Sequence, residues 1–403
     1  MNHNSAFEQL AAKVVDELPT LSPIGATGLG DHRSDDQFNE VSAQARTREA
    51  AFYRSVLATL DSIDINGLNR ENQIDAALLK HNLNSELWQL ETLREWEWNP
   101  LIYTNMAGGS VYSLMARDFA PIEERLVNAT ARLEKMPRFL AQVRKTLILE
   151  RVPKVHAETA INQNKGAISI VDALVRPQMD KLNEPQRKRL EAAIENATAA
   201  INRHQEWLEN TLLPVANGDF RIGAEKFDVK LNYTLFSPLS RAEVRTRAER
   251  EFKQVREQMY EVARQLVNPD APDIPDADTQ QEMIKAGLAL AYAQVPGRDQ
   301  IVAVARENLA QATEFVRAKD LVEVPDDPVE IIIMPEFQRG FSVAYCDSPG
   351  ALDRGQKTFY AVAPLPESWT EEQVGSFLRE YNLLSIQDLT IHEAMPGHYL
   401  QLA

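Results

Sequence analysis

Apolar residues recur at every third or fourth position along most of the chain, which is the pattern of amphipathic helices. A clear example follows Glu184, where one face carries Leu190, Ile194, Ala197, Ile201 and Trp207. The same period predicts helices over residues 5–18, 48–63, 71–96, 120–150, 155–175, 184–213 and 241–267, with two more before residue 318. Residues 1–320 are therefore predicted to form a helical scaffold.

The pattern changes after Leu321. Three segments are rich in β-branched and aromatic residues, either in a continuous run or in alternation: residues 329–334, 341–345 and 357–363. They predict a small antiparallel β-sheet. Thr370 and Gln373 form a capping box that opens a helix to about Tyr381, and Ser385 with Asp388 is expected to start the next helix in the same manner. The fold class is thus mainly α, with the sheet preceding the last helix.

Two features of the helical part have a structural and a functional interpretation. The run Met106–Ser110 is expected to be a turn rather than a phosphate loop, because it lacks the preceding strand and the Gly-Lys-Ser/Thr ending. His32 follows an aspartate in a predicted loop rich in Pro, Gly and Asp. Such a histidine can be functional, but a solvated side chain is the preferred interpretation.

Candidate chemistry is concentrated near the end of the sequence, in His392-Glu393-Ala394-Met395-Pro396-Gly397-His398. Two histidines with a glutamate directly after the first are typical of zinc hydrolases, in which imidazoles bind the metal and the carboxylate accepts a proton from the activated water. His392 and His398 are therefore candidate metal ligands, and Glu393 is the candidate general base.

The spacing of the two histidines differs from that of the common H-E-x-x-H motif. Residues four apart lie about 40° from each other around a helix, whereas residues six apart lie about 120° apart. Proline cannot continue the hydrogen bonding of a helix and glycine adopts conformations closed to other residues. Looping out about two residues at Pro396 and Gly397 would bring both imidazoles to one side. The alternative is a surface helix that ends at Pro-Gly, with two unrelated histidines.

The string HEAMPGHYLQ resembles the signature HExxPGHxxQ of a bacterial family, the domain of unknown function 885. Similarity extends upstream to residues 28–31, 99–104, 137–140 and 335–337. The family is regarded as related to HExxH-type metallopeptidases, so the resemblance implies a mostly helical, cleft-containing metallopeptidase-like fold. It also implies His392 and His398 as ligands of one zinc ion and Glu393 as general base.

Catalytic zinc sites usually have three protein ligands. In the resembling family an acidic residue lies in a later helical part, whereas this sequence reaches only Ala403, five residues beyond His398. We therefore expect the third ligand to lie outside this chain, so that residues 321–403 hold the sheet and only the start of the catalytic region. On this expectation the chain as given is inactive.

Composition narrows the classes of partner. The formal net charge of −16 disfavours nucleic acid, because phosphate binding requires clustered Lys and Arg. No stretch approaches 18 apolar residues, so no membrane span is expected. The start has no signal peptide, which predicts a cytoplasmic protein; an exported or lipoprotein form is the alternative if the start was processed or engineered. Cys346, a single cysteine, is expected to be a small core residue.

The sequence thus predicts a zinc-dependent metallopeptidase acting on peptide substrates. A sheet directly before the H-E helix suits peptide binding, because an edge strand can hold an extended peptide by main-chain hydrogen bonds. Two alternatives remain open. The first is a catalytically inactive helical binding or scaffold protein, and the second is a metal hydrolase that cleaves a non-peptide amide or an ester.

Overall fold

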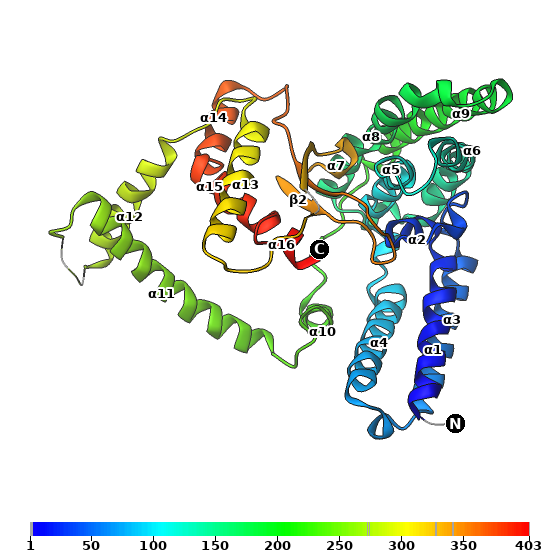
Figure 1. Ribbon diagram of the computed structural model, residues 1–403, viewed down its shortest axis with the longest axis horizontal. Helices are drawn as coiled ribbons and strands as arrows, with labels where there is room; N and C mark the ends of the chain where they lie inside the picture. Colours follow the sequence, from blue (N-terminus) through cyan, green and yellow to red (C-terminus); the bar gives the residue numbers. More distant parts are fainter. Residues whose placement is uncertain (1–2, 272, 274, 327–328, 341, 403) are drawn as a thin grey trace. The chain divides into compact units, whose positions relative to one another are not determined.

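Helices predominate in the structure, a computed structural model, and the strands form one small sheet (Figure 1). The structure describes residues 3–271, 273, 275–326, 329–340 and 342–402. Within these residues, no helix combines the length and the apolar character needed to cross a bilayer.

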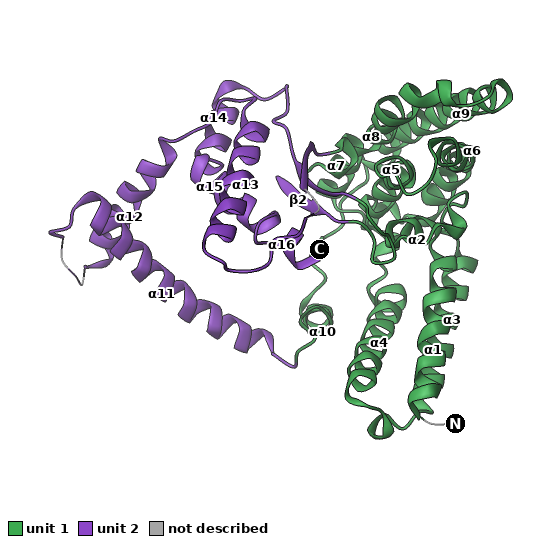
Figure 2. Ribbon diagram, viewed as in Figure 1, with its two compact units in different colours: residues 1–237, 335–340, 349–356 green, residues 238–334, 341–348, 357–403 purple. Residues whose placement is uncertain are grey.

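The chain divides into two compact units (Figure 2). Unit 1 contains Met1–Ser237, Pro335–Gly340 and Pro349–Gln356, and unit 2 contains Pro238–Met334, Phe341–Ser348 and Lys357–Ala403. The predicted boundary at residue 320 marks the change from helices to strands. By contacts, however, the helices after residue 237 belong with the strands, because the sheet packs directly on one of them.

Unit 1 is built from helices. They are α1 (His3–Glu17), α2 (Pro23–Leu29), α3 (Ala43–Asp61), α4 (Arg70–Trp88), α5 (Leu101–Met115), α6 (Ile122–Thr146), α7 (Lys154–Asn164), α8 (Gly166–Ile170), α9 (Glu184–Trp207) and α10 (Ala224–Leu235). Helices α1, α3 and α4 run side by side (Figure 1) and share an apolar cluster that includes Phe7, Tyr53 and Leu83.

The larger core of unit 1 lies between α5, α6 and α9. Helix α9 begins where predicted, because Asn183 and Gln186 form a capping box at its N-terminus. Its predicted apolar face is confirmed: Leu190, Ile194 and Ile201 are buried in this core. Amphipathic periodicity therefore located the main packing surface of the unit.

The turn predicted at Met106–Ser110 is wrong, since these residues lie inside α5. Gly108 in this segment, together with Gly166 of α8, makes room for the side chain of Phe337. A Cβ atom on Gly108 would lie 2.3 Å from Cγ of Phe337, and one on Gly166 would lie 2.5 Å from the Phe337 backbone nitrogen. Phe337, from the segment Pro335–Gly340, is thus buried against two helices at positions where any larger residue would collide.

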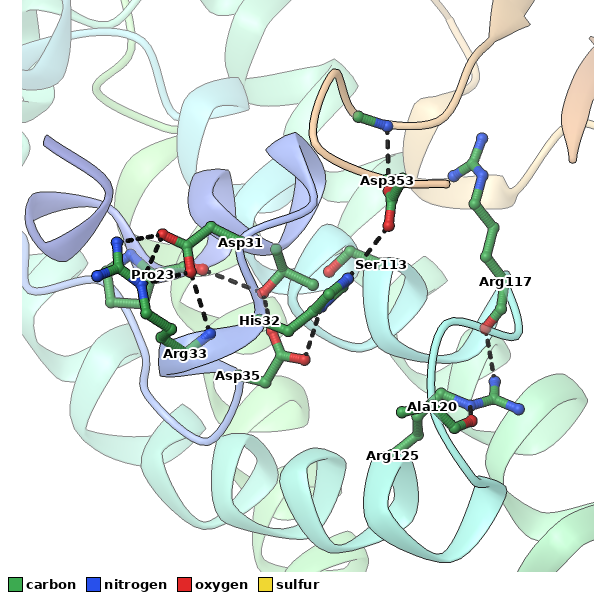
Figure 3. A network of polar contacts seen from close by, with 12 residues as sticks. Pro23, Asp31, His32, Arg33, Asp35, Ser113, Arg117, Ala120, Arg125 and Asp353 are labelled. Atoms are coloured by element: carbon green, nitrogen blue, oxygen red, sulfur yellow. Dashed lines mark hydrogen bonds and ion pairs between the residues drawn. The ribbon is translucent and has the colours of Figure 1, made fainter. Parts of the chain in front are cut away.

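A polar network fixes the second inserted segment of unit 1, Pro349–Gln356 (Figure 3). His32 lies between two carboxylates, with Nδ1 2.9 Å from Asp35 Oδ2 and Nε2 3.2 Å from Asp353 Oδ1. Its ring stacks on Phe119 at a centroid distance of 3.6 Å. The preferred interpretation of His32 as a solvated loop residue is therefore wrong: it ties the segment to the residues that follow α2.

Unit 2 contains α11 (Arg241–Val267), α12 (Ala277–Tyr292), α13 (Ile301–Ala318), β1 (Val329–Ile333), β2 (Ala344–Asp347), β3 (Thr358–Val362), α14 (Glu371–Glu380), α15 (Leu383–Glu393) and α16 (His398–Leu402). The strand order is β1-β3-β2. The predicted capping box of Thr370 and Gln373 at the start of α14 is confirmed.

The prediction of an antiparallel sheet is wrong for one of its two strand pairs. β2 and β3 pair antiparallel, with Cys346 opposite Tyr360, but β1 and β3 pair parallel, with Ile331 opposite Tyr360. A parallel pair requires a long connection between its strands, and residues 334–357 supply one. An apolar pattern fixes which side chains are buried but leaves strand direction undetermined. Of the predicted strand over residues 341–345, Phe341 lies outside the described residues.

The core of unit 2 joins the sheet to α13 and α15. All five residues of the central strand β3 are buried. Ala305 of α13, Tyr360 of β3 and Ile386 of α15 belong to one cluster. Helix α15, which carries the first candidate ligand, is therefore supported along its buried face by the sheet.

Candidate metal centre

Helix α15 positions His392 and Glu393 in its last turn. The helix begins at Leu383, because the side chain of Asn382 accepts hydrogen bonds from the backbone N–H groups of Leu384 (3.0 Å) and Ser385 (3.2 Å). The cap expected at Ser385 is thus three residues late. Asn and Ser are both good caps, and the sequence alone did not distinguish them.

The face of α15 that carries Thr390 packs against the sheet. The Thr390 hydroxyl donates to the Ile386 carbonyl at 2.7 Å and lies 3.4 Å from the Tyr360 hydroxyl. Burial raises the pKa of Tyr360 to about 12, which the contact with Thr390 opposes and the nearby Glu393 carboxylate reinforces. Tyr360 is 1% exposed, so it supports the helix from beneath and does not face solvent.

The helix is broken between the two histidines. It ends at Glu393, the peptide bond between Met395 and Pro396 is cis, and a new helix, α16, begins at His398. Gly397 lies so close to the end of α15 that an added Cβ atom would be 1.8 Å from the His392 carbonyl oxygen. The chain therefore folds back onto the preceding turn, and only glycine fits at this approach.

This return brings the three candidate residues together. Each side chain offers one ligand atom: an imidazole nitrogen from His392 and from His398, and a carboxylate oxygen from Glu393. These three atoms lie within 4.8 Å of one another. The imidazole rings meet edge to face, with their centroids 4.7 Å apart and an angle of 81° between their planes. Within the described part of the chain, these three side chains form a group compact enough to hold a metal ion.

The two histidines and the glutamate differ in their surroundings. His392 and His398 are exposed, and no hydrogen bond or ion pair among the described residues engages either ring. Glu393 is buried, and its Oε2 accepts a hydrogen bond from the backbone N–H of Cys346 at 3.1 Å. That bond fixes one oxygen of the Glu393 carboxylate and so orients the side chain from the sheet.

Cys346 belongs to β2, an edge strand of the described sheet. It is half-buried and packs beside a small cluster of Val316, Met395 and Tyr399. The sequence predicts a core residue here, and the contact of Cys346 with Glu393 is made by its main chain. Sequence reasoning could not identify a backbone donor, because every residue type except proline supplies the same N–H group.

The residues present fit a zinc ion by their donor chemistry. Two imidazoles and a carboxylate are the nitrogen and oxygen ligands that zinc takes in catalytic sites. The exposure of both rings leaves the histidines accessible, whereas the buried Glu393 is held by the sheet. His392 and His398 would hold the ion, and the carboxylate beside them is placed either to bind it or to act as a base.

The sequence profile of the family described as "Bacterial protein of unknown function (DUF885)" matches residues 23–403. The chain belongs to this family. Its predicted membership is thereby confirmed, and the match includes the complete segment that carries the three candidate residues.

Two solved structures resemble this DUF885 chain. One, described as "a putative lipoprotein of unknown function from Shewanella oneidensis", is 28% identical with a TM-score of 0.73. The other, "the putative lipoprotein from Colwellia psychrerythraea", is 17% identical with a TM-score of 0.70 and shows likeness of fold alone. Each match covers 98% of this chain and 71% of the other. No curated protein matches the sequence significantly.

Proposed function

We propose that this DUF885 protein is a zinc-dependent metallopeptidase, with His392 and His398 as metal ligands and Glu393 as general base. The observation that carries the proposal is the approach of the three side chains to within 4.8 Å at a break between two helices. An unrelated pair of histidines at the end of a surface helix would not need a glycine folded against the preceding turn.

A zinc ion supplies Lewis-acid chemistry at such a centre, since it polarises a carbonyl group and acidifies water. The protein's own contribution is the carboxylate of Glu393. Its Oε2 is held by the Cys346 N–H, so Oε1 accepts the proton that water releases as it attacks the scissile carbonyl. The same oxygen then returns the proton to the leaving amine, which completes the proton balance of hydrolysis.

The edge strand favours a peptide as substrate. β2 is an edge strand of the described sheet, next to β3, and its Cys346 N–H lies against the general base. An extended peptide that lies along such an edge forms main-chain hydrogen bonds and brings its carbonyl groups to a fixed distance from the helix. An ester or a small amide would lack most of these bonds.

The decisive variant is Glu393→Gln in the intact protein with zinc bound. We expect its kcat on peptides to fall by about 10²- to 10⁴-fold, because the amide cannot accept the proton, while zinc content is unchanged. Glu372→Gln, which alters an exposed glutamate on α14, serves as the matched control. Full peptide hydrolysis by Glu393→Gln would contradict the mechanism.

A substrate panel separates the two alternative functions. Hydrolysis of esters or simple amides without peptide cleavage would identify a non-peptide hydrolase. A protein that holds no zinc and cleaves none of the panel would be a helical binding protein.

We further propose that the protein is exported, in place of the cytoplasmic location first expected. The support is the similar Shewanella oneidensis structure, which is described as "a putative lipoprotein of unknown function". Fractionation of cells that express the native gene tests this. Recovery in the periplasmic or membrane fraction supports export, and recovery in the cytoplasm with a marker enzyme opposes it.

A further inference from the structure

An apolar cavity of about 450 Å³ lies in unit 2, beside the candidate metal centre. One wall comes from α13, through Ala312, Phe315 and Val316, and another comes from Ile391 of α15. Met395 also lines it, from the turn that separates the two histidines. This volume falls within the range of small-molecule pockets.

The cavity and the metal centre share one piece of chain. Ile391 directly precedes His392, and Pro396, which also lines the cavity, lies two residues before His398. Neighbouring Cα atoms are about 3.8 Å apart. The cavity lining and the candidate ligands therefore lie within a few residues of one another along the chain.

The lining shows which chemistry the cavity selects. Its floor contains Val316 and Met395, which are buried, whereas Phe315 and Leu321 at its mouth are more than half exposed, at 58% and 56%. Covering such apolar surface is favourable by about 25 cal/mol per Å². Among the residues that the structure describes, no charged side chain lines the cavity, so it favours an aliphatic or aromatic group over an acidic or basic one.

Polar groups at the cavity are amides. Gln311 of α13 and Gln387 of α15 complete part of the lining. A primary amide both donates and accepts hydrogen bonds, which matches the N–H and C=O groups of a peptide main chain. A peptide can therefore place its side chain on the apolar floor while its backbone bonds to the two glutamines.

We propose that this cavity binds a large apolar side chain of the substrate, adjacent to the bond that is cleaved. The proposal rests on the proposed peptidase function. It makes the protein selective for peptides with Leu, Met or Phe at that position over those with Gly, Asp or Lys.

The first test requires no catalysis. The protein, labelled with ¹³C at isoleucine and methionine methyl groups, is titrated with N-acetyl-leucinamide. We expect saturable shifts of the Ile391 and Met395 methyl signals, with an effect at least about 10-fold weaker for N-acetyl-glycinamide. Absence of shifts at both methyl groups at millimolar ligand overturns the proposal. The same absence is expected if another segment of protein covers the cavity.

The second test uses Ala312→Phe, which fills the cavity from α13. Its control is Ala310→Phe, at an exposed position of the same helix outside the cavity. We expect Ala312→Phe to lower kcat/KM for Leu-containing peptides by about 10- to 100-fold relative to Ala-containing ones, and Ala310→Phe to leave that ratio unchanged. An unchanged ratio in Ala312→Phe overturns the proposal.

The two tests separate the failure of this proposal from failure of the proposed function. If the methyl signals shift but no peptide is cleaved, the cavity binds apolar groups and the peptidase assignment fails. If peptides are cleaved with no preference at any position, the peptidase assignment stands and the cavity proposal fails.

Discussion

His32 in unit 1 and the pair His392 and His398 in unit 2 have similar neighbours by residue type, since carboxylates lie close to both. Their environments are nevertheless opposite. Both ring nitrogens of His32 face carboxylates, and its ring is stacked on Phe119. The rings of His392 and His398 are exposed and face each other.

The difference shows how to distinguish a structural histidine from a candidate ligand. A metal ion needs a nitrogen lone pair that no other group uses. At His32 the hydrogen-bonding capacity of the ring is taken by Asp35 and Asp353, so the residue joins segments of unit 1. At the turn between α15 and α16, the nitrogens remain available for a ligand.

The largest expected effect tests the availability of those nitrogens. Replacing either His392 or His398 by Ala should lower zinc affinity by more than about 100-fold, beyond the usual loss for an outer-shell partner. Zinc content after dialysis, measured by elemental analysis, is the readout. His32→Ala should keep the zinc content of the unaltered protein. Retention of one equivalent of zinc by both single variants would remove the distinction between the two sites.

The structural role of His32 is tested by measuring folding stability. His32→Ala removes the ring that contacts both carboxylates, and the Asp35 side chain is only 2% exposed. We expect the free energy of unfolding to fall by about 2–4 kcal/mol, as measured by urea denaturation. His3→Ala, at an exposed position of α1, is the control. A loss below about 0.5 kcal/mol would show that the network contributes little.

A fourth histidine, His204, sharpens the comparison, because it is buried and no carboxylate among the described residues pairs with it. Burial, with a smaller contribution from the Arg144 guanidinium, lowers the pKa of His204 to about 3. Arg144 Nη1 lies 3.4 Å from Nδ1 of His204. Since arginine only donates, Nδ1 accepts and the ring is neutral in the folded protein.

The sign of the pH effect follows from this depressed pKa. Below about pH 6.5 the unfolded chain takes up a proton that the folded protein does not. The free energy of unfolding therefore decreases as the pH is lowered, by up to about 1.4 kcal/mol per pH unit. The loss continues until about pH 3. Between pH 7 and pH 4.5, His204→Gln should lose about 2 kcal/mol less than the unaltered protein in urea denaturation. Equal losses of stability in the two proteins would contradict a neutral His204 in the folded state.

Much of the fold was readable from the sequence because helices have a strong local signal. The faces of α9 and the cap of α14 depend on residues within a few positions of one another. The turn wrongly predicted at Gly108 and the parallel pairing of β1 with β3 depend on distant partners. Phe337 is far from Gly108 in the sequence, and nothing near Gly108 indicates that its ring would pack there.

The candidate site divides in the same way. The His and Glu positions, and the need for a break at Pro396 and Gly397, follow from residue type and helical geometry. The hydrogen bond from a main-chain N–H of β2 to Glu393 could not be predicted, because a backbone donor has no sequence signature. The cavity beside the turn also depends on α13, which the sequence does not connect to α15.

The tight return at Gly397 also determines how strongly a metal would restrain the chain. Six positions separate the two histidines, so joining them closes a very short loop and removes little entropy from the unfolded chain. So short a chelate can also bind zinc in the unfolded chain, which reduces the stabilisation gained on folding. Zinc held by this pair alone would therefore raise the melting temperature less than its affinity suggests. A ligand from a distant segment would instead make the ion a long-range cross-link, whose restraint grows with the logarithm of the chain length enclosed.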